Sequence, residues 1–296
     1  RADISSKGLG NVVSEDFAYF SRLVYIDASS NNLNLMVFEG FQRLRDLRLA
    51  CNGIRDLTDM RKMNDESFRM LTNLDLSYNA LNTADFSHLT SLENLAVLDI
   101  TYNEMLEVPS PASLSKFQSL KILKAGHNSF EGDATLIALA QIPTLLELDL
   151  SYNYIQKIPQ EVIEEHSFPQ LQTLNLAYNY IPEEEYLLPA VLIERLTRLI
   201  VFGNPLCGPT GEDPTNDCVS RVEYAAIEAR DGWGSRDFVI ICERGDDKKR
   251  MGSTGSKTSK MRGGLYKDLQ LSAVLDDNLP TGAAFRHAGN RALSVK

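Results

Sequence analysis

The sequence is poor in the residues that build disulfide networks, metal sites and membrane spans. Its 296 residues include four cysteines and four histidines, with no CxxC pair and no cluster of histidines. This argues against disulfide-rich secreted modules and zinc sites. No run approaches the ~20 apolar residues of a membrane helix, and there is no Asn-x-Ser/Thr sequon, which a secreted repeat protein would usually carry. Together these absences favour a reducing, cytoplasmic compartment and no membrane insertion.

Catalytic sets are absent from the sequence as well. The histidines lie in separate segments without metal-ligand spacing, and no Ser/His/Asp or Cys/His arrangement can be nominated. The stretch Gly-Ser-Lys-Thr at 255–258 resembles a phosphate loop only faintly, because a serine separates the glycine from the lysine and the flanks are polar. We therefore expect no enzyme, no catalytic residue, no cofactor, no metal and no small-molecule substrate.

Charge is divided unevenly along the chain. Residues 248–296 hold 10 Lys/Arg against 3 Asp/Glu, a net charge of +7, whereas residues 1–247 hold 20 against 37, a net charge of −17. The composition also changes at Gly245, beyond which a Gly/Ser/Lys-rich linker precedes a modest apolar stretch too small to fold alone. An acidic body with a basic tail suggests that the tail binds an acidic surface.

What the sequence has in abundance is a repeat. The pattern L-x-x-L-x-L-x-x-N-x-L occurs eight times between Leu23 and Leu206, and its asparagines are 21 to 27 residues apart, a spacing typical of leucine-rich repeats. The L-x-L core predicts a short strand with alternate side chains pointing inward. Stacked coils then form a parallel sheet. The asparagines of the pattern are Asn31, Asn52, Asn79, Asn103, Asn128, Asn153, Asn179 and Asn204.

These features predict an α/β solenoid, a leucine-rich-repeat horseshoe of about eight repeats over residues 23–206, with a parallel β-sheet on its concave face. The convex side should be helical or irregular, with helices expected at 67–71, 135–140 and 161–166. Residues 1–22 are expected to form an N-terminal cap, with an amphipathic segment at 17–20. Residues 207–244 should form a C-terminal cap that contains a strand at 237–243. Residues 245–296 should be an extended, partner-bound tail.

The repeat asparagines are expected to be structural. An amide at this position can bond backbone groups that the turn would otherwise leave buried and unpaired, a loss worth about 1–3 kcal/mol each. The residue before each asparagine varies along the chain and is most often aromatic. It is Ser30, Cys51, Tyr78, Tyr102, His127, Tyr152, Tyr178 and Gly203 in successive repeats.

Two columns of the solenoid are therefore candidates for a partner-binding surface. One is the residue between the two strand leucines, which should point out of the concave sheet. The other is the aromatic register before the asparagine, since tyrosine is large, rigid and favoured at interfaces. The alternative for the tyrosines is that they only pack between coils, because Leu-Asp-Leu-Ser-Tyr-Asn is a common form of the repeat. The candidate residues are Asp27, Arg48, Asp75, Tyr78, Asp99, Tyr102, Lys124, His127, Asp149, Tyr152, Tyr178 and Phe202.

The basic tail is the second candidate contact. Its cationic side chains, with one tyrosine, are expected to anchor the chain to a larger assembly. An acidic lattice such as tubulin would suit them, whereas nucleic acid is a weaker expectation. The anchor candidates are Lys248, Lys249, Arg250, Lys257, Lys260, Arg262 and Tyr266.

Over residues 23–206 the chain resembles the leucine-rich-repeat superfamily. The run Val-Tyr-Ile-Asp-Ala-Ser-Ser-Asn at 24–31, the run Leu-Asp-Leu-Ser-Tyr-Asn at 74–79 and the closing Gly-Asn-Pro-Leu-Cys-Gly-Pro at 203–209 resemble, within it, the X-ray radiation resistance-associated protein family. The resemblance implies no enzymatic activity. Intracellular repeat proteins of this kind also recur in cilia and flagella.

We therefore expect a cytoplasmic, non-enzymatic scaffold in a large protein complex, whose concave face binds a protein partner and whose tail anchors it, plausibly in the cytoskeleton or a ciliary axoneme. Two alternatives stay open. One is an extracellular, receptor-type recognition domain, in which Cys207 and Cys218 would pair. The other is a nuclear, nucleic-acid-associated factor that uses the basic tail.

Overall fold

The computed structural model describes residues 1–10, 12, 20, 22–64, 66–163, 167–207 and 238–242. The chain divides into two compact units, Arg1–Gly245 and Asp246–Lys296, and every described residue belongs to the first. Residues 17–19 of the expected amphipathic segment, most of the expected C-terminal cap and the whole tail therefore lie outside the described residues, together with the tail-anchor candidates.

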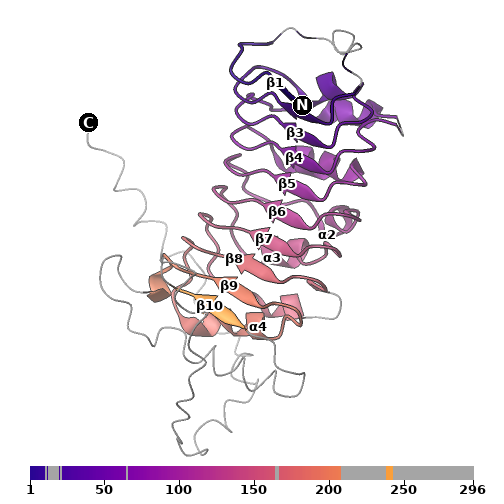
Figure 1. The fold of residues 1–296 in the computed structure, drawn as a ribbon. Coiled ribbons are helices and arrows are strands. Elements are labelled where there is room, and N and C mark those ends of the chain that lie inside the picture. Colours follow the sequence, from indigo (N-terminus) through magenta and orange to yellow (C-terminus); the bar gives the residue numbers. More distant parts are fainter. Residues whose placement is uncertain are drawn as a thin grey trace, which may run out of the picture. The chain divides into compact units, whose positions relative to one another are not determined.

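The described part of the first unit is a solenoid built on one parallel sheet (Figure 1). Ten strands follow one another across it in chain order. This confirms the predicted leucine-rich-repeat fold. The strands are β1 (Ala2–Asp3), β2 (Tyr25–Asp27), β3 (Asp46–Arg48), β4 (Asn73–Asp75), β5 (Val97–Asp99), β6 (Ile122–Lys124), β7 (Glu147–Asp149), β8 (Thr173–Asn175), β9 (Arg198–Ile200) and β10 (Val239–Ile241).

Two of these strands lie beyond the eight repeats read from the sequence. β10 falls within the strand expected at 237–243 and pairs with β9. β1 corrects the repeat number, because residues 1–9 form a further coil whose strand pairs with β2. Lys7 occupies the place of the repeat asparagine there, and its backbone N–H donates to Asn31 Oδ1 at 3.1 Å. The pattern missed this coil because it lacks both the asparagine and the strand leucines.

The core lies behind the sheet. The middle residue of each strand from β2 to β10 points inward and is at most 2% exposed, while its two neighbours lie on the open face of the sheet, as the two-residue period of a strand requires. Each buried aliphatic side chain contributes roughly 1.5–3 kcal/mol. These residues are Ile26, Leu47, Leu74, Leu98, Leu123, Leu148, Leu174, Leu199 and Ile240.

The other side of the coils carries short helices. The helix expected at 135–140 is present as α3 (Asp133–Leu139). The expectation at 67–71 is wrong: this segment forms turns because Phe68 has a φ of +53°, which a right-handed helix does not admit. The remaining helices in the described ranges are η2 (Leu35–Phe38), η3 (Thr58–Lys62), α1 (Thr83–His88), η4 (Leu89–Ser91), α2 (Pro111–Leu114), η5 (Gln160–Ile163), η6 (Glu184–Leu187), α4 (Leu188–Val191) and η7 (Pro205–Cys207).

η5 overlaps the third helix expected from the sequence, at 161–166, whose last three residues are outside the described part. Among the described helices, none has the length and apolar composition that crossing a bilayer requires.

Candidate partner-binding site

The repeat asparagines form an internal column that ties each coil to the one before it. Asn153 is typical: its Oδ1 accepts the N–H of Phe130 at 3.0 Å, and its Nδ2 donates to the carbonyls of Ala125 at 3.1 Å and Leu150 at 3.0 Å. Six of the eight asparagines are at most 5% exposed, and Asn31 and Asn79 are intermediate. Because every amide bonds backbone groups of two coils, this column holds the stack together and offers nothing to a ligand.

The residue before each asparagine turns the chain out of the strand. All eight positions have a left-handed backbone, with φ between +51° at His127 and +74° at Gly203. The backbone N–H of this residue donates to the next coil, as Tyr152 does to the carbonyl of Ala177 at 2.9 Å. The side chain is consequently directed along the surface of the stack, one ring above the next.

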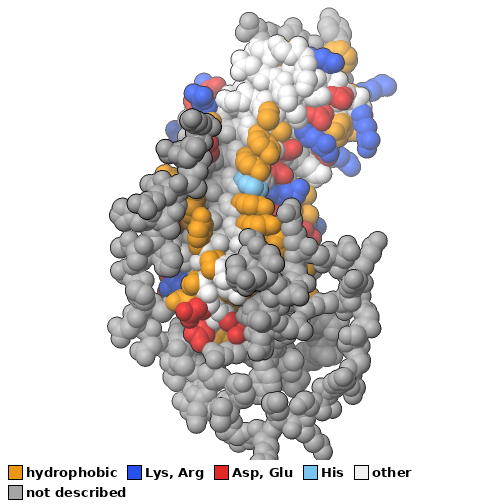
Figure 2. Space-filling model, turned by 90° about the vertical axis from the view of Figure 1, so that its left-hand side faces the viewer, with side chains coloured by type: hydrophobic (Ala, Val, Ile, Leu, Met, Phe, Trp, Pro, Cys, Tyr) orange, Lys and Arg blue, Asp and Glu red, His pale blue; other side chains and the backbone are white. Residues whose placement is uncertain are grey.

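Five of these side chains stack face to face. Ring centroids are 4.2 Å apart for Tyr78–Tyr102, 3.9 Å for Tyr102–His127, 4.0 Å for His127–Tyr152 and 4.2 Å for Tyr152–Tyr178, with interplanar angles of 12–17°. We call these five rings the aromatic column. It is visible in Figure 2 as a vertical row of hydrophobic side chains interrupted by a histidine. Packing between coils, one of the two interpretations of the sequence, therefore occurs, but it leaves the ring edges and hydroxyls at the surface.

The aromatic column ends at the eighth repeat. The ring of Phe202 meets Tyr178 edge-on, with centroids 5.3 Å apart and an interplanar angle of 89°. Gly203 leaves room for this arrangement, because a Cβ at that position would lie 2.5 Å from a ring carbon of Tyr178. Phe202 thus closes the column and is not one of its stacked members.

A second pair of rings runs beside the aromatic column. Tyr154 and Tyr180, each two residues beyond a column tyrosine, are parallel to within 5° with centroids 5.4 Å apart. Between the two rows lies a shallow groove of about 340 Å³, whose lining also includes Asn128 and Asn153. We call it the aromatic groove. It is lined by Tyr102, His127, Asn128, Tyr152, Asn153, Tyr154, Tyr178 and Tyr180.

The walls of the aromatic groove remain open to solvent. Tyr152 is 39% exposed, Tyr154 46% and Tyr180 51%. Sequence reasoning missed Tyr154 and Tyr180 because only two repeats carry tyrosine after the asparagine, where the others have Asn32, Gly53, Ala80, Glu104, Ser129 and Pro205. The signal that could have identified Tyr154 and Tyr180 is that each lies two residues after a tyrosine of the aromatic column.

Two rings of the aromatic groove, His127 and Tyr102, have shifted pKa values. Desolvation by its neighbours lowers the pKa of His127, and the Asp149 carboxylate only partly offsets this effect. Desolvation, with the hydrogen bond to Tyr78, likewise raises the pKa of the Tyr102 hydroxyl. This hydroxyl lies 3.0 Å from Nε2 of His127, at hydrogen-bonding distance. Both pKa shifts favour the neutral form of the ring, the imidazole at His127 and the phenol at Tyr102.

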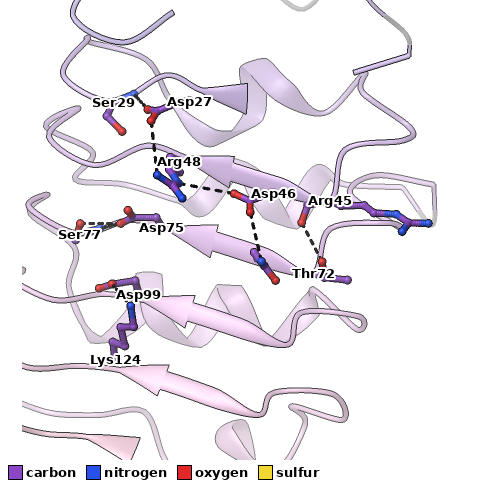
Figure 3. A network of polar contacts seen from close by, with 11 residues as sticks. Asp27, Ser29, Arg45, Asp46, Arg48, Thr72, Asp75, Ser77, Asp99 and Lys124 are labelled. Atoms are coloured by element: carbon purple, nitrogen blue, oxygen red, sulfur yellow. Dashed lines mark hydrogen bonds and ion pairs between the residues drawn. The ribbon is translucent and has the colours of Figure 1, made fainter. Parts of the chain in front are cut away.

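The open face of the sheet is charged. The residues predicted to point outward do so, at the third position of β2 to β7, and Figure 3 shows those of β2 to β6 with their polar contacts. Arg48 lies 3.9 Å from both Asp27 and Asp46, and Lys124 lies 3.5 Å from Asp99. Such partly exposed pairs contribute little to stability, typically about 0–1 kcal/mol each.

The aspartates of this face also serve the fold. In Asp27, Asp75, Asp99 and Asp149, Oδ1 accepts the N–H two residues ahead, as in the 2.9 Å bond from Ser77 to Asp75. One carboxylate oxygen of each is thus committed to its own strand end, and in Asp27 and Asp99 the other oxygen forms the ion pair with Arg48 or Lys124. Sequence reasoning missed the first position of each strand, which shares this face: Tyr25, Asp46, Asn73, Val97, Ile122, Glu147, Thr173 and Arg198.

The structure thus brings the predicted residues together in two adjacent strips, the charged open face and the aromatic column. Within the described ranges, no three His, Cys, Asp or Glu side chains are grouped so that they could hold a metal ion.

Comparisons with known proteins agree with this architecture. The leucine rich repeat family matches residues 69–130. Lumican from Oryctolagus cuniculus is 30% identical over 163 residues, which are 48% of this chain and 83% of that sequence. The chain belongs to the leucine-rich-repeat family. In fold, this leucine-rich-repeat protein is similar to internalin C2 from Listeria monocytogenes, with a TM-score of 0.52 at 21% identity, covering 68% of this chain and 80% of that one.

Two longer relatives match part of their length. X-ray radiation resistance-associated protein 1 from Mus musculus is 31% identical over 173 residues, 53% of this chain and 22% of that protein. Chaoptin from Drosophila melanogaster is 32% identical over 168 residues, 55% of this chain and 12% of that protein. The leucine-rich-repeat protein described here thus resembles the X-ray radiation resistance-associated family, as its sequence indicated, and spans about a fifth of the length of the mouse relative.

Proposed function

We propose that this leucine-rich-repeat protein is a non-enzymatic scaffold that binds a protein partner at the aromatic groove and the adjoining charged face of the sheet. The observation that carries the proposal is the aromatic groove itself, in which the wall formed by Tyr154 and Tyr180 is 46–51% exposed. Exposed, rigid tyrosines with neutral hydroxyls are the side chains that interfaces concentrate.

The test compares partner recovery by the full chain and two variants. In the first, Tyr154→Ala and Tyr180→Ala together remove one groove wall. In the matched control, Tyr78→Ala removes a column ring that is 52% exposed but does not line the groove. Quantitative mass spectrometry after affinity purification should show a set of proteins lost with the double variant and retained with the control. Equal recovery by all three proteins would contradict the groove as the binding site.

We extend the proposal to the tail and to the cellular setting. Residues 248–296 would anchor the acidic body to an acidic surface in a cytoplasmic assembly, plausibly cytoskeletal or axonemal. The support is the contrast between +7 in the tail and −17 in residues 1–247, together with electrostatic complementarity as a means of association.

Co-sedimentation with microtubules tests this part. Replacing Lys248, Lys249, Arg250, Lys257, Lys260 and Arg262 by glutamine in the full chain should abolish co-sedimentation, and added salt should weaken it in the unaltered chain. A chain that sediments equally well with and without these charges would remove the anchor from the proposal.

A second candidate function is extracellular, receptor-type recognition with the same groove. The similarity to lumican and chaoptin motivates it. Mass spectrometry of the unreduced protein from its native source discriminates the two settings, because a bond between Cys207 and Cys218 would favour the extracellular one.

A further inference from the structure

We propose that the coils of β2, β3 and β4 carry a second interaction surface, which binds an acidic segment of a partner protein that also presents aliphatic side chains. The surface lies where the chain enters these strands, and we call it the strand-entry patch. It uses no residue of the aromatic groove or of the open face of the sheet, so it stands apart from the proposed function. It consists of Arg22, Val24, Arg43, Arg45 and Met70.

The patch residues occupy equivalent places in successive coils. Each of the three strands follows a turn in which a leucine N–H donates to the carbonyl three residues earlier, at 2.9–3.0 Å. These leucines are Leu23, Leu44 and Leu71. The strands pair in register, so equivalent residues of neighbouring coils lie about 4.7–4.9 Å apart. The residue before the leucine is Arg22, Arg43 or Met70 in turn, and the residue after it is Val24 in the first of these coils and Arg45 in the second.

The side chains of the patch face the solvent because the leucine between them enters the core. Leu44 is 0% exposed, whereas Arg43 and Arg45 on either side of it are exposed. Figure 3 shows the Arg45 side chain extending away from the ion pairs of the open face. Val24 is 42% exposed and Met70 40%. The patch therefore combines cationic and aliphatic groups.

The arginines of the patch have no acidic partner among the described residues, where none of the three forms an ion pair. The carboxylates next to them in sequence have other contacts: Asp46 lies 3.9 Å from Arg48, and Glu39 Oε1 accepts the hydroxyl of Ser67 at 2.7 Å. Like charges at equivalent positions of neighbouring strands repel each other. A carboxylate from a partner would relieve this repulsion, because a guanidinium can donate two parallel hydrogen bonds to it.

The charge of the whole body decides among acidic partners. Residues 1–247 have a net charge of −17, and the resulting field opposes the approach of an extended polyanion. Nucleic acids and anionic bilayers are bound through many basic residues, whereas the patch has three. A short acidic segment requires only what the patch provides, arginines for its carboxylates and an apolar contact at Val24 and Met70.

Fluorescence anisotropy with labelled peptides tests the proposal. The protein is the full chain with the six tail cations named above replaced by glutamine, so that the tail does not attract the probe. The probe is a peptide of repeated Glu-Glu-Leu triplets. A Gln-Gln-Leu peptide controls for charge and a Glu-Glu-Ser peptide for apolar contact. We expect the probe to bind at least about tenfold more tightly than either control peptide.

The arginines are tested with a matched pair of triple variants. Arg22→Gln, Arg43→Gln and Arg45→Gln together should weaken binding of the probe at least about tenfold. The control variant has the same net charge, because glutamine replaces three exposed cations from separate coils, and it should bind the probe as tightly as the parent chain. These cations are Arg55, Lys116 and Arg195. Melting curves followed by circular dichroism verify that both variants are folded.

The apolar part is tested with Val24→Ser and Met70→Ser together. This pair should remove the preference for Glu-Glu-Leu over Glu-Glu-Ser and keep the preference for Glu-Glu-Leu over Gln-Gln-Leu. The Tyr154→Ala and Tyr180→Ala pair should leave binding of the probe unchanged, so the aromatic groove is judged by its own experiment.

Four results would overturn the proposal. The first is failure of the Glu-Glu-Leu peptide to bind, and the second is an equal loss of binding in the two triple variants, which would reduce the effect to net charge. The third is equal binding of Glu-Glu-Ser, which would remove the apolar contact. The fourth is tighter binding of phosphatidylserine vesicles or of single-stranded DNA at the same arginines, which would make the ligand a polyanion and not an acidic protein segment.

Discussion

In the five repeats that carry the aromatic column, its ring and the asparagine of the repeat are consecutive residues, yet their side chains point in different directions. Asn153 is 2% exposed and bonds the backbone of two coils, whereas Tyr152, one residue earlier, is 39% exposed and touches chiefly the rings above and below it. Both columns have the same period. The period therefore reflects the geometry of the coil and does not distinguish the two roles. A side chain that points inward stabilises the solenoid, whereas one that points outward can also bind a partner.

Replacing a residue of the asparagine column should lower the free energy of unfolding more than replacing a residue of the aromatic column. Asn153→Ala leaves the N–H of Phe130 and the carbonyls of Ala125 and Leu150 without their amide partner. Each unsatisfied buried group costs roughly 1–3 kcal/mol, so we expect a loss of about 3 kcal/mol or more in the free energy of unfolding. Urea unfolding followed by circular dichroism measures it.

The matched control is an exposed asparagine. Asn94 makes a single described hydrogen bond, from Nδ2 to the carbonyl of Arg69 at 3.0 Å, and Asn94→Ala should change stability by no more than about 0.5 kcal/mol. Similar losses for the two variants would mean that burial does not set the asparagine column apart.

The aromatic column should give an intermediate effect. Tyr152 stacks on both sides, with His127 and Tyr178, whereas Tyr78 stacks on Tyr102 alone within the column. Aromatic pairs contribute about 0.5–1.5 kcal/mol each, so Tyr152→Ala should cost about 1–2 kcal/mol and Tyr78→Ala about half as much. Parallel urea titrations of the two variants provide the measurement.

The ratio of the stability losses of Tyr152→Ala and Tyr78→Ala shows whether stacking accounts for them. If the losses are equal, stacking is not what Tyr152 contributes. If both lie near zero, the column adds nothing to the fold, and its tyrosines are left with binding as their only role.

Period and residue type were enough to predict the solenoid. The L-x-L core placed β2 to β9 because an alternating aliphatic strand has one buried face, and one asparagine per coil marked the turn. The first coil escaped this reasoning because Lys7 stands where the asparagine would be, although its N–H still bonds Asn31. The left-handed turn at Phe68 also escaped it, since nothing in that segment marks a positive φ.

The candidate site was predictable in part. The position before the asparagine identified the five rings of the aromatic column. The groove also needs Tyr154 and Tyr180 as a second wall, and a periodic pattern could not identify them because only two repeats carry a tyrosine there. The sheet aspartates show the reverse difficulty. Their outward direction followed from strand alternation, whereas the bond from Oδ1 to the backbone two residues ahead depends on the local turn.

His127 gives the smallest effect and the sharpest question about the aromatic column, because it is the one titratable ring among tyrosines near neutral pH. Desolvation lowers the pKa of His127 from its ordinary value and outweighs the Asp149 carboxylate, which favours an imidazolium at this ring. Cation–π attraction to the two stacked rings acts in the same direction as Asp149. The unfolded chain then takes up a proton first as the pH falls. Stability from a neutral His127 is therefore present above about pH 6.5 and is lost as the pH falls toward its folded-state pKa.

His127→Phe keeps a ring in the column and removes the titration, so the difference in melting temperature between this variant and the unaltered chain isolates the histidine from carboxylates that titrate lower. We expect the unaltered chain to lose stability relative to the variant on acidification from about pH 7.5 to 5.5, the interval around the ordinary histidine pKa. A relative gain would mean that the rings and Asp149 stabilise the imidazolium more than desolvation opposes it. The aromatic column would then hold a cation at its centre.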